Sequence, residues 1–339
     1  MVAQRSRMTL GGRATSIWQL LRPRAQRTHV GILRDGVQHM GYSSHPGGNT
    51  SGSDVQRPKV TLQTVRNLYR KNIPITVLTA HDYPSGIVAD RGGIDIVLVG
   101  DSLAMVALGY ENTNQITLDE MISHTRAVAR GAKAPFLVAD LSFGTYEISA
   151  EQALATSIRM AQEGRAEAVK LEGGIEMAHT ISTITRAGIP VMGHIGLTPQ
   201  RSTSLGGFRV QGKTATAAQH LLESAQALEA AGCFTIVLEA VPEEVGKYIT
   251  ERVSVPTIGI GAGKYCSGQV LVQMDMLGYF DKFTPKFVKK YADMHGTTIA
   301  AVADYASEVR AGTFPAAEHT YPMSEQETAR LAERADKME

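Results

Sequence analysis

Charged side chains stand at the ends of several short apolar runs in this chain. Asp101 and Asp140 each follow such a run, Lys170 and Glu172 lie two residues apart in another, and Glu239 closes a fourth. Buried charges are costly unless they are compensated, and a bound cation would compensate these carboxylates. Carboxylates without a cluster of His or Cys suit a hard, oxygen-preferring ion. The residue types therefore predict a Mg2+-dependent active site.

Each of these groups also has a structural alternative. Asp101 or Asp140, taken alone, could cap the helix that follows its strand. His194 could be a structural histidine, or it could contact the substrate or a neighbour of the metal. Ser102 lacks a neighbouring base and is no candidate nucleophile, but its hydroxyl and backbone N–H could hold a substrate carboxylate. Helix capping explains single acids and does not explain the whole set.

The elements that must position these residues are eight apolar, β-branched runs separated by helix-like segments. Such runs predict parallel strands that are buried on both faces. Eight of them predict a closed (β/α)8 barrel, a TIM barrel of the α/β class, with its active site at the C-terminal ends of the strands. Residues two apart share a face, which places Asp101 with Val99 and Glu239 with Val237. The predicted strands are 75–80, 94–100, 135–139, 168–171, 190–193, 234–238, 255–260 and 269–274.

Helices are expected between the strands, with Thr117 and Ser149 as N-caps of two of them. The longest loop, 197–213, is rich in Gly, Ser, Thr and Gln, and long loops inside compact domains are often functional. The glycine-rich stretch 259–263 could bind phosphate or form a tight turn. The predicted helices are 84–91, 118–130, 150–163, 175–186, 215–231, one that opens at Pro242, and 285–295 and 297–311, which should close the barrel.

Charge divides the chain of 339 residues into a basic leader and a mildly acidic body. Residues 1–58 hold eight arginines, no lysine and two acidic residues, a formal charge of +6, whereas residues 59–339 hold 26 basic and 31 acidic residues, a charge of −5. An Arg-rich, acid-poor leader predicts an organelle transit peptide, and a disordered basic tail is the alternative. We expect the catalytic barrel at 59–321 and a charged tail at 322–339, with room for one peripheral helix.

Composition also excludes several classes of protein. The two cysteines, Cys233 and Cys266, give neither a disulfide framework nor the spacing of a metal site, which favours a reducing compartment. The acidic body argues against nucleic acid as a partner. No run approaches the roughly 18 apolar residues of a membrane span, so no membrane partner is expected. Small molecules are the expected ligands.

Several segments, taken in order, resemble the ketopantoate hydroxymethyltransferase family. The resemblance covers about residues 59–321 and implies a barrel of the phosphoenolpyruvate/pyruvate superfamily, in agreement with the strand count. The segments are 97–103 (VLVGDSL), 137–140 (LVAD), 169–174 (VKLEGG), 193–200 (GHIGLTPQ), 206–212 (GGFRVQG), 237–242 (VLEAVP) and 258–263 (IGIGAG).

The resemblance implies a reaction and a role for each candidate residue. The family moves a one-carbon unit from 5,10-methylenetetrahydrofolate to 3-methyl-2-oxobutanoate, giving 2-dehydropantoate on the route to pantothenate. By position, Asp101 and Asp140 match the Mg2+ ligands, and Glu172 completes the metal site directly or through water. Substrate contacts are implied for these two aspartates and for the residues Ser102, Lys170 and His194, and Glu239 matches the catalytic base.

The sequence leaves two rival hypotheses for the function, and it also suggests an oligomeric state and a cellular compartment. A Mg2+-dependent carbon–carbon lyase or mutase of the same superfamily is the nearest rival, although such lyases supply a reactive cysteine at the mouth. A catalytically silent barrel that binds folate or a partner is a second rival, and the intact charged set argues against it. The resemblance suggests a large homo-oligomer, commonly a decamer, and the leader fits a fungal form in the mitochondrial matrix.

Overall fold

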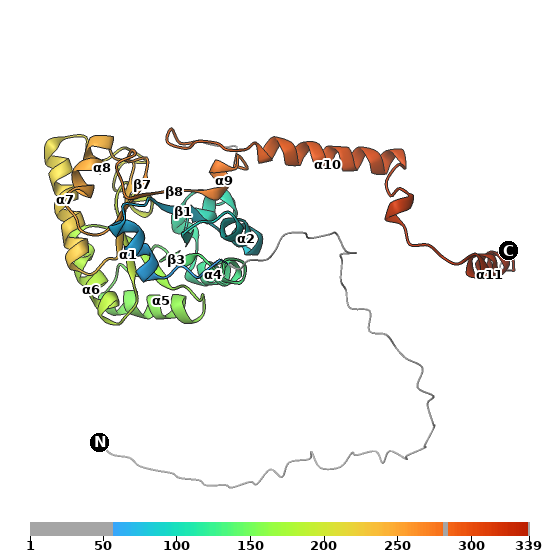
Figure 1. The fold of residues 1–339 in the computed structure, drawn as a ribbon, viewed down its shortest axis with the longest axis horizontal. Helices are drawn as coiled ribbons and strands as arrows, with labels where there is room; N and C mark the ends of the chain where they lie inside the picture. Colours follow the sequence, from blue (N-terminus) through green and yellow to red (C-terminus); the bar gives the residue numbers. More distant parts are fainter. Residues whose placement is uncertain (1–56, 281–283, 338–339) are drawn as a thin grey trace, which may run out of the picture. The chain divides into compact units, whose positions relative to one another are not determined.

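The computed structural model describes residues 57–280 and 284–337. Eight parallel strands form a closed barrel in sequence order, and the last strand pairs with the first (Figure 1). The predicted (β/α)8 fold is confirmed, and each predicted strand overlaps an observed one. The strands are β1 (Ile75–Thr79), β2 (Ile96–Val99), β3 (Phe136–Asp140), β4 (Ala168–Glu172), β5 (Val191–Gly196), β6 (Thr235–Glu239), β7 (Thr257–Ile260) and β8 (Gly268–Leu271).

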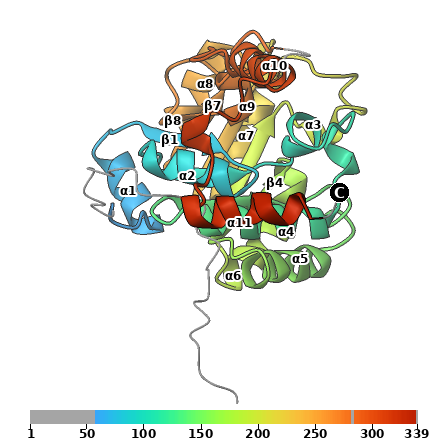
Figure 2. The same cartoon turned by 90° about the vertical axis from the view of Figure 1, so that its right-hand side faces the viewer.

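Helices lie outside these strands, and neighbours such as α5 and α6 pack against each other (Figure 2). The predicted caps Thr117 and Ser149 are confirmed, since the side chain of each accepts a backbone N–H of the following helix. The helices are α1 (Leu62–Arg70), α2 (Tyr83–Arg91), α3 (Leu103–Val106), α4 (Leu118–Gly131), α5 (Ala150–Gln162), α6 (Ala178–Arg186), α7 (Ala215–Ala230), α8 (Glu243–Thr250), α9 (Gln273–Met276), α10 (Met294–Ala311) and α11 (Glu325–Ala335). The short 3-10 helices are η1 (Thr113–Gln115), η2 (Ile175–Met177), η3 (Pro199–Arg201) and η4 (Ala317–His319).

Alternation along the strands produces two apolar layers. Val138 and Val237 belong to a cluster inside the barrel, whereas Leu137 and Ile236 belong to a cluster between the strands and the helices. Helix α1, which sequence reasoning did not predict, adds Val65 to the inner cluster, which also holds Ile75 and Phe136 at the starts of their strands and Phe234 directly before β6. The N-terminal end of the barrel is therefore filled with apolar side chains, which leaves the opposite end for chemistry.

Three sequence predictions about the C-terminal part were wrong. Strand β8 ends at Leu271, and α9 begins at Gln273, so the second half of the predicted strand 269–274 is not strand. Residues 285–295 form no continuous helix, because the backbone N–H groups of Tyr291 and Met294 bind the carbonyls of Met276 and Leu277. Helix α10 buries none of its residues and therefore does not close the barrel.

The structure describes the C-terminal tail but little of the predicted leader. The predicted leader, 1–58, lies outside the described residues except for its last two positions, of which Arg57 donates to the carbonyl of Ile94. The predicted peripheral helix in the tail is confirmed as α11, which is exposed throughout. Among the helices of the described residues, none is long and apolar enough to cross a bilayer.

Candidate active site

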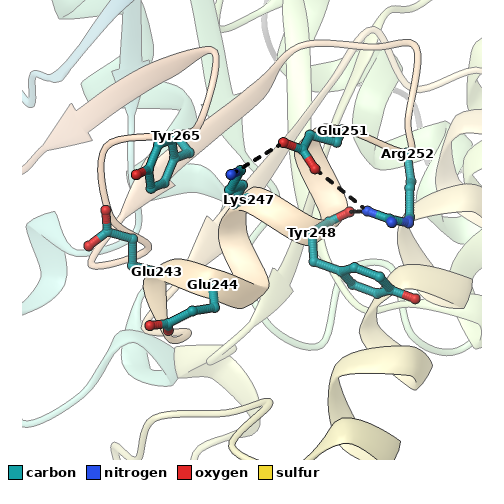
Figure 3. Close-up of a pocket in the computed structure, with 7 residues that line it drawn as sticks. All are labelled: Glu243, Glu244, Lys247, Tyr248, Glu251, Arg252 and Tyr265. Carbon is teal, nitrogen blue, oxygen red and sulfur yellow. Dashed lines mark hydrogen bonds and ion pairs between the residues drawn. The ribbon is translucent and has the colours of Figure 1, made fainter.

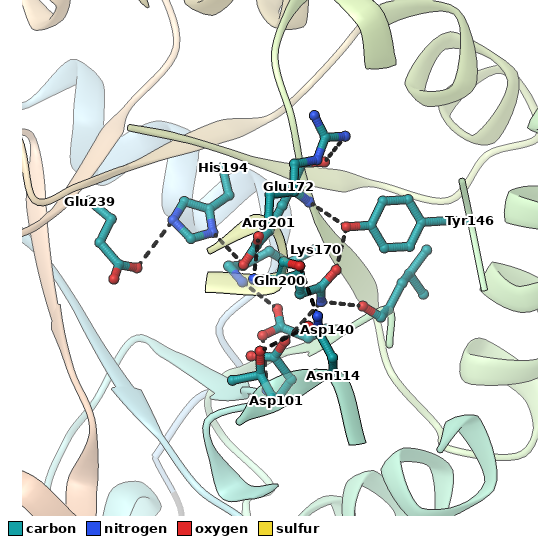
Figure 4. A network of polar contacts seen from close by, with 12 residues as sticks. Asp101, Asn114, Asp140, Tyr146, Lys170, Glu172, His194, Gln200, Arg201 and Glu239 are labelled. Carbon is teal, nitrogen blue, oxygen red and sulfur yellow. Dashed lines mark hydrogen bonds and ion pairs between the residues drawn. The ribbon is translucent and has the colours of Figure 1, made fainter. Parts of the chain in front are cut away.

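Strand register brings two pairs of polar residues together at the C-terminal end of the barrel. Asp140 on β3 lies opposite Lys170 on β4, and Glu172 on β4 lies opposite His194 on β5. Asp140, Lys170 and Glu172 belong to the alternating inward positions, as the strand pattern predicted. All four side chains are at most 7% exposed, so they form a buried charged cluster (Figure 4).

Asp101 reaches this cluster by a different route from the one predicted. The strand-face argument grouped it with Val97 and Val99, but these two side chains pack in the layer against the helices. The chain leaves strand geometry after Val99, and the turn at 101–102 brings Asp101 to Asp140, where the backbone N–H of Asp101 donates to Oδ2 of Asp140 at 3.0 Å. The prediction that the two aspartates meet is confirmed, although its reasoning was wrong for Asp101.

Helix capping does not explain either aspartate. The N-cap of α3 is Ser102, and the carboxylate of Asp101 accepts the side chain of Gln200 rather than a helix N–H. Asp140 uses Oδ1 for the ammonium of Lys170 at 2.7 Å. Asp82 is the contrasting case, because its carboxylate accepts the N–H of Ser85 and caps α2.

His194 lies between two carboxylates. Its Nδ1 is 3.5 Å from Oε1 of Glu172, and its Nε2 is 3.2 Å from Oε2 of Glu239. Neither contact has hydrogen-bond geometry, so charge rather than a directed bond holds the ring. Burial and Lys170 lower the pKa of His194, but the two carboxylates outweigh them and raise it to about 9. His194 is therefore protonated at neutral pH.

The cluster carries an excess of negative charge. Burial and the neighbouring Asp140 raise the pKa of Asp101 well above its usual range, against the opposing effect of Lys170. Burial lowers the pKa of Lys170, but Asp140, Asp101 and Glu172 outweigh it, and the net direction is upward. The ammonium therefore stays charged, and one lysine and one histidine face four carboxylates. A cation would relieve this imbalance.

The donor set fits Mg2+. No group of three or more His, Cys, Asp and Glu side chains in the described part of the chain is arranged to hold a metal ion by itself. Mg2+ commonly takes one or two carboxylates and completes its shell with water and substrate oxygens. Asp101 and Asp140 are such a pair. Glu172 contacts His194 and the backbone of Gln200, so its role as a third ligand stays a prediction.

Sequence reasoning assigned no role to Gln200, which the structure places in the middle of the cluster. Its side chain donates to Oδ2 of Asp101 at 2.8 Å and to the carbonyl of Leu141 at 2.9 Å, and it accepts the hydroxyl of Tyr146. The available signal was its position, since Gln200 closes the segment 193–200 and lies near the start of the longest loop, 197–213.

Other candidates from the sequence are structural or remain predictions. A Cβ on Gly263 would lie 2.4 Å from Cγ of Glu243, so this glycine is needed for close packing against α8, which favours the tight-turn reading. Ser102 is partly buried, directly after Asp101, and its substrate contact stays a prediction. Burial raises the pKa of Cys266, and it raises that of Cys233 to about 12, so neither is the reactive thiol that a lyase needs.

A separate hollow of about 550 Å3 lies on the outer surface of α8 (Figure 3). It shares no residue with the charged cluster, and its lining holds three acidic and two basic residues, with carboxylate oxygens of Glu251 3.8 Å from Nζ of Lys247 and 3.8 Å from Nη1 of Arg252. Arg252 also stacks over Tyr248 at 4.1 Å. The lining residues are Glu243, Glu244, Lys247, Tyr248, Glu251, Arg252 and Tyr265. The buried cluster is therefore the better candidate for the active site.

The fold is similar to that of solved enzymes of low sequence identity. A phosphonopyruvate hydrolase solved with oxalate and Mg2+ superposes with a TM-score of 0.52 at 15% identity, over 82% of this chain and 96% of that protein. A phosphoenolpyruvate phosphomutase from Streptomyces platensis subsp. rosaceus gives 0.51 at 16% identity, over 82% and 96%. These likenesses support the barrel fold.

Comparison with known sequences identifies the family more specifically than the comparison of folds does. A protein named 3-methyl-2-oxobutanoate hydroxymethyltransferase from Emericella nidulans is 56% identical over 284 residues, 83% of this chain and 81% of that protein. One of the same name from Oleidesulfovibrio alaskensis is 57% identical over 259 residues, 76% and 90%. The sequence model of ketopantoate hydroxymethyltransferase matches residues 59–317. The chain therefore belongs to the ketopantoate hydroxymethyltransferase family.

Proposed function

We propose that this protein transfers a hydroxymethyl group from 5,10-methylenetetrahydrofolate to 3-methyl-2-oxobutanoate, giving 2-dehydropantoate for pantothenate synthesis. The relatives carry the name of this activity, and the buried cluster supplies the groups that the reaction needs. The observation that carries the proposal is the position of Glu239. Its side chain is 15% exposed, whereas those of Asp140 and Glu172 are 2% and 1% exposed, so Glu239 is the carboxylate open to a substrate.

The reaction requires loss of the C3 proton of the 2-oxo acid and stabilisation of the enolate that results. Bound Mg2+ would supply a Lewis acid for the 2-oxo oxygen, with Asp101 and Asp140 as its protein ligands. Glu239 would take the C3 proton at its carboxylate, and the protonated ring of His194 holds that carboxylate in place. The ammonium of Lys170 adds positive charge where the oxygen becomes negative. The nucleophilic C3 would then form a bond to the one-carbon unit, the bonds of that carbon to the folate nitrogens would break to release tetrahydrofolate, and water would supply the hydroxyl oxygen.

Exchange of the C3 proton tests this proposal. In D2O with Mg2+, the full chain should exchange this proton of 3-methyl-2-oxobutanoate, as followed by NMR, and EDTA should stop the exchange. Glu239→Gln should lower the rate by a factor of about 10² to 10⁴, the usual contribution of a general base. Glu244→Gln, on the exposed face of α8, is the matched control. Metal-dependent exchange at the wild-type rate in Glu239→Gln would refute its role as the base.

The folate step needs its own assay. With 5,10-methylenetetrahydrofolate present, the wild-type chain should form 2-dehydropantoate and tetrahydrofolate in equal amounts. Proton exchange without this product would show that the barrel enolises a 2-oxo acid but does not use folate. Such a result would remove the transferase proposal and return the superfamily lyases to consideration.

We propose further that the protein forms a homo-oligomer. Apolar side chains on α10 support this proposal, because Ile299, Val302, Tyr305 and Val309 follow at intervals of three, three and four residues and are 46–61% exposed. This spacing places them on one side of the helix, and contiguous exposed apolar surface is typical of interaction sites. Light scattering should give a mass several times that of one chain, and a monomer would refute the proposal.

We also propose that the protein acts in the mitochondrial matrix. The eight arginines and two acidic residues of 1–58 support this, since such a composition is typical of an organelle transit peptide. Residues 1–58 fused to a fluorescent protein should direct it to mitochondria. A cytosolic fusion protein would refute the proposal.

A further inference from the structure

Gln200, in the loop after β5, bonds to the loops after β2 and β3 and to the end of β4, and all its polar groups have partners (Figure 4). Its side chain reaches the loops after β2 and β3, at Asp101 and Leu141. Its backbone N–H donates to Oε2 of Glu172 at 3.1 Å, and its carbonyl accepts the side chain of Asn114 at 3.0 Å. Gln200 is 3% exposed, so these bonds form away from competing water.

The hydroxyl of Tyr146 sets the orientation of the Gln200 amide. This hydroxyl accepts the backbone N–H of Glu172 at 3.3 Å, which leaves its own proton to donate to Oε1 of Gln200. With Oε1 turned to Tyr146, the NH2 group faces Asp101 and Leu141 and uses one proton for each. Rotating the amide would set its NH2 against the phenol and its oxygen against two acceptors. One orientation is therefore strongly preferred.

We propose that Gln200 is a positioning residue for the metal site. The bond from Nε2 fixes the Oδ2 side of the Asp101 carboxylate and leaves Oδ1 for the metal. Partners that orient ligands in this way commonly contribute 10–100-fold to metal affinity or activity. The inference rests on the proposed function only in taking Asp101 as a metal ligand.

The same residue links the metal site to the loop that follows β5. Gln200 belongs to η3, and the residues beyond it, 201–213, carry mostly exposed side chains, including Phe208 at 58%. Metal binding at Asp101 is thus connected to the first turn of this loop through the buried side chain of Gln200. A metal that orders Asp101 would also order the start of the loop.

Metal binding without substrates tests the proposal. Mn2+ serves as the probe for the full chain, with its affinity measured by electron paramagnetic resonance. Gln200→Met keeps the length of the side chain and removes the amide, and it should bind Mn2+ 10–100-fold more weakly. Gln273→Met is the matched control, because Gln273 is also 3% exposed but donates to the carbonyl of Ser85 and to no carboxylate. Wild-type affinity in a folded Gln200→Met variant would overturn the proposal.

Thermal melting separates positioning from a merely structural role. A positioning role reduces the rise in Tm that saturating Mn2+ produces in the wild type, whereas a structural role lowers Tm equally with and without metal. Tyr146→Phe removes one hydroxyl and keeps the ring, so it decides the matter if Gln200→Met does not fold. It should also weaken Mn2+ binding, and unchanged affinity in Tyr146→Phe would then overturn the proposal.

Mn2+ affinity and C3 proton exchange together distinguish a failure of the proposed function from a failure of the positioning role. If wild-type protein binds Mn2+ and loses affinity in Gln200→Met but never exchanges the C3 proton, the positioning role stands and the reaction is wrong. If exchange occurs and both variants bind Mn2+ as the wild type does, the reaction stands and the role of Gln200 is wrong.

Discussion

Removing Lys170 should destabilise the protein more than removing its partner Asp140. The two form a buried ion pair at 2.7 Å, with side chains 7% and 2% exposed. Lys170 also interacts with Asp101 and Glu172, so Lys170→Met removes the one ammonium that three buried carboxylates share. Breaking a buried pair from one side costs about 3–5 kcal/mol. For a domain of this size that corresponds to a fall in Tm of roughly 6–10 °C.

Asp140→Asn should be milder, because Lys170 still faces two carboxylates. The double variant Lys170→Met/Asp140→Asn removes the carboxylate that Lys170 compensated most directly, so it should be about 1–2 kcal/mol more stable than Lys170→Met. The assay is urea and thermal unfolding of the full chain in EDTA, with the exposed Lys133→Met as control. Additive losses in the double variant would refute the charge argument.

Two further predictions concern positions away from the cluster. Burial raises the pKa of Asp275 to about 6, against the effect of Lys290. A carboxyl group with a raised pKa contributes stability below its ordinary pKa and loses it as pH rises through the folded value, so the stability of Asp275→Asn relative to wild type should rise between pH 4 and 7. Because Asp275 is partly exposed, the relative rise in the free energy of unfolding should be about 1 kcal/mol. If the difference in stability between Asp275→Asn and wild type does not change with pH, the prediction is wrong. A Cβ on Gly268 would lie 2.3 Å from the carbonyl oxygen of Ile75. Gly268→Ala should cost at least about 1–3 kcal/mol in urea unfolding, whereas Gly109→Ala meets open space and should cost only its backbone strain, about 1 kcal/mol.

The parts of the fold that follow from repeating patterns could be predicted from the sequence. Every strand of the barrel was found, because apolar runs between helix-like segments are a strong and local signal. Lys170, Glu172 and Glu239 were placed correctly for the same reason, since each lies within a strand whose alternation fixes its face. The sequence did not reveal their partners, because register depends on neighbouring strands that are distant along the chain.

The failures fall where tertiary contacts outweigh local pattern. The segment 285–295 has apolar residues at helical spacing, but Phe287 packs against the inner cluster and against Gly261. Backbone N–H groups of this segment donate to carbonyls at the end of α9 and directly after it. Asp101 was misplaced because a turn changes its direction after β2. The five hydrogen bonds of Gln200 reach residues 28 to 99 positions away along the chain, separations that no local pattern encodes.

The origin of each residue also explains how the site can be both rigid and adjustable. Asp140, Lys170, Glu172 and His194 stand on three adjacent strands, where a slip of one residue would turn a side chain to the other face, so the barrel itself fixes this part of the site. Asp101 comes from a turn instead and depends on Gln200 for its orientation. Because the loop-borne ligand is the less constrained one, variation in metal affinity within this scaffold should arise at the Gln200 contact before it arises in the strands.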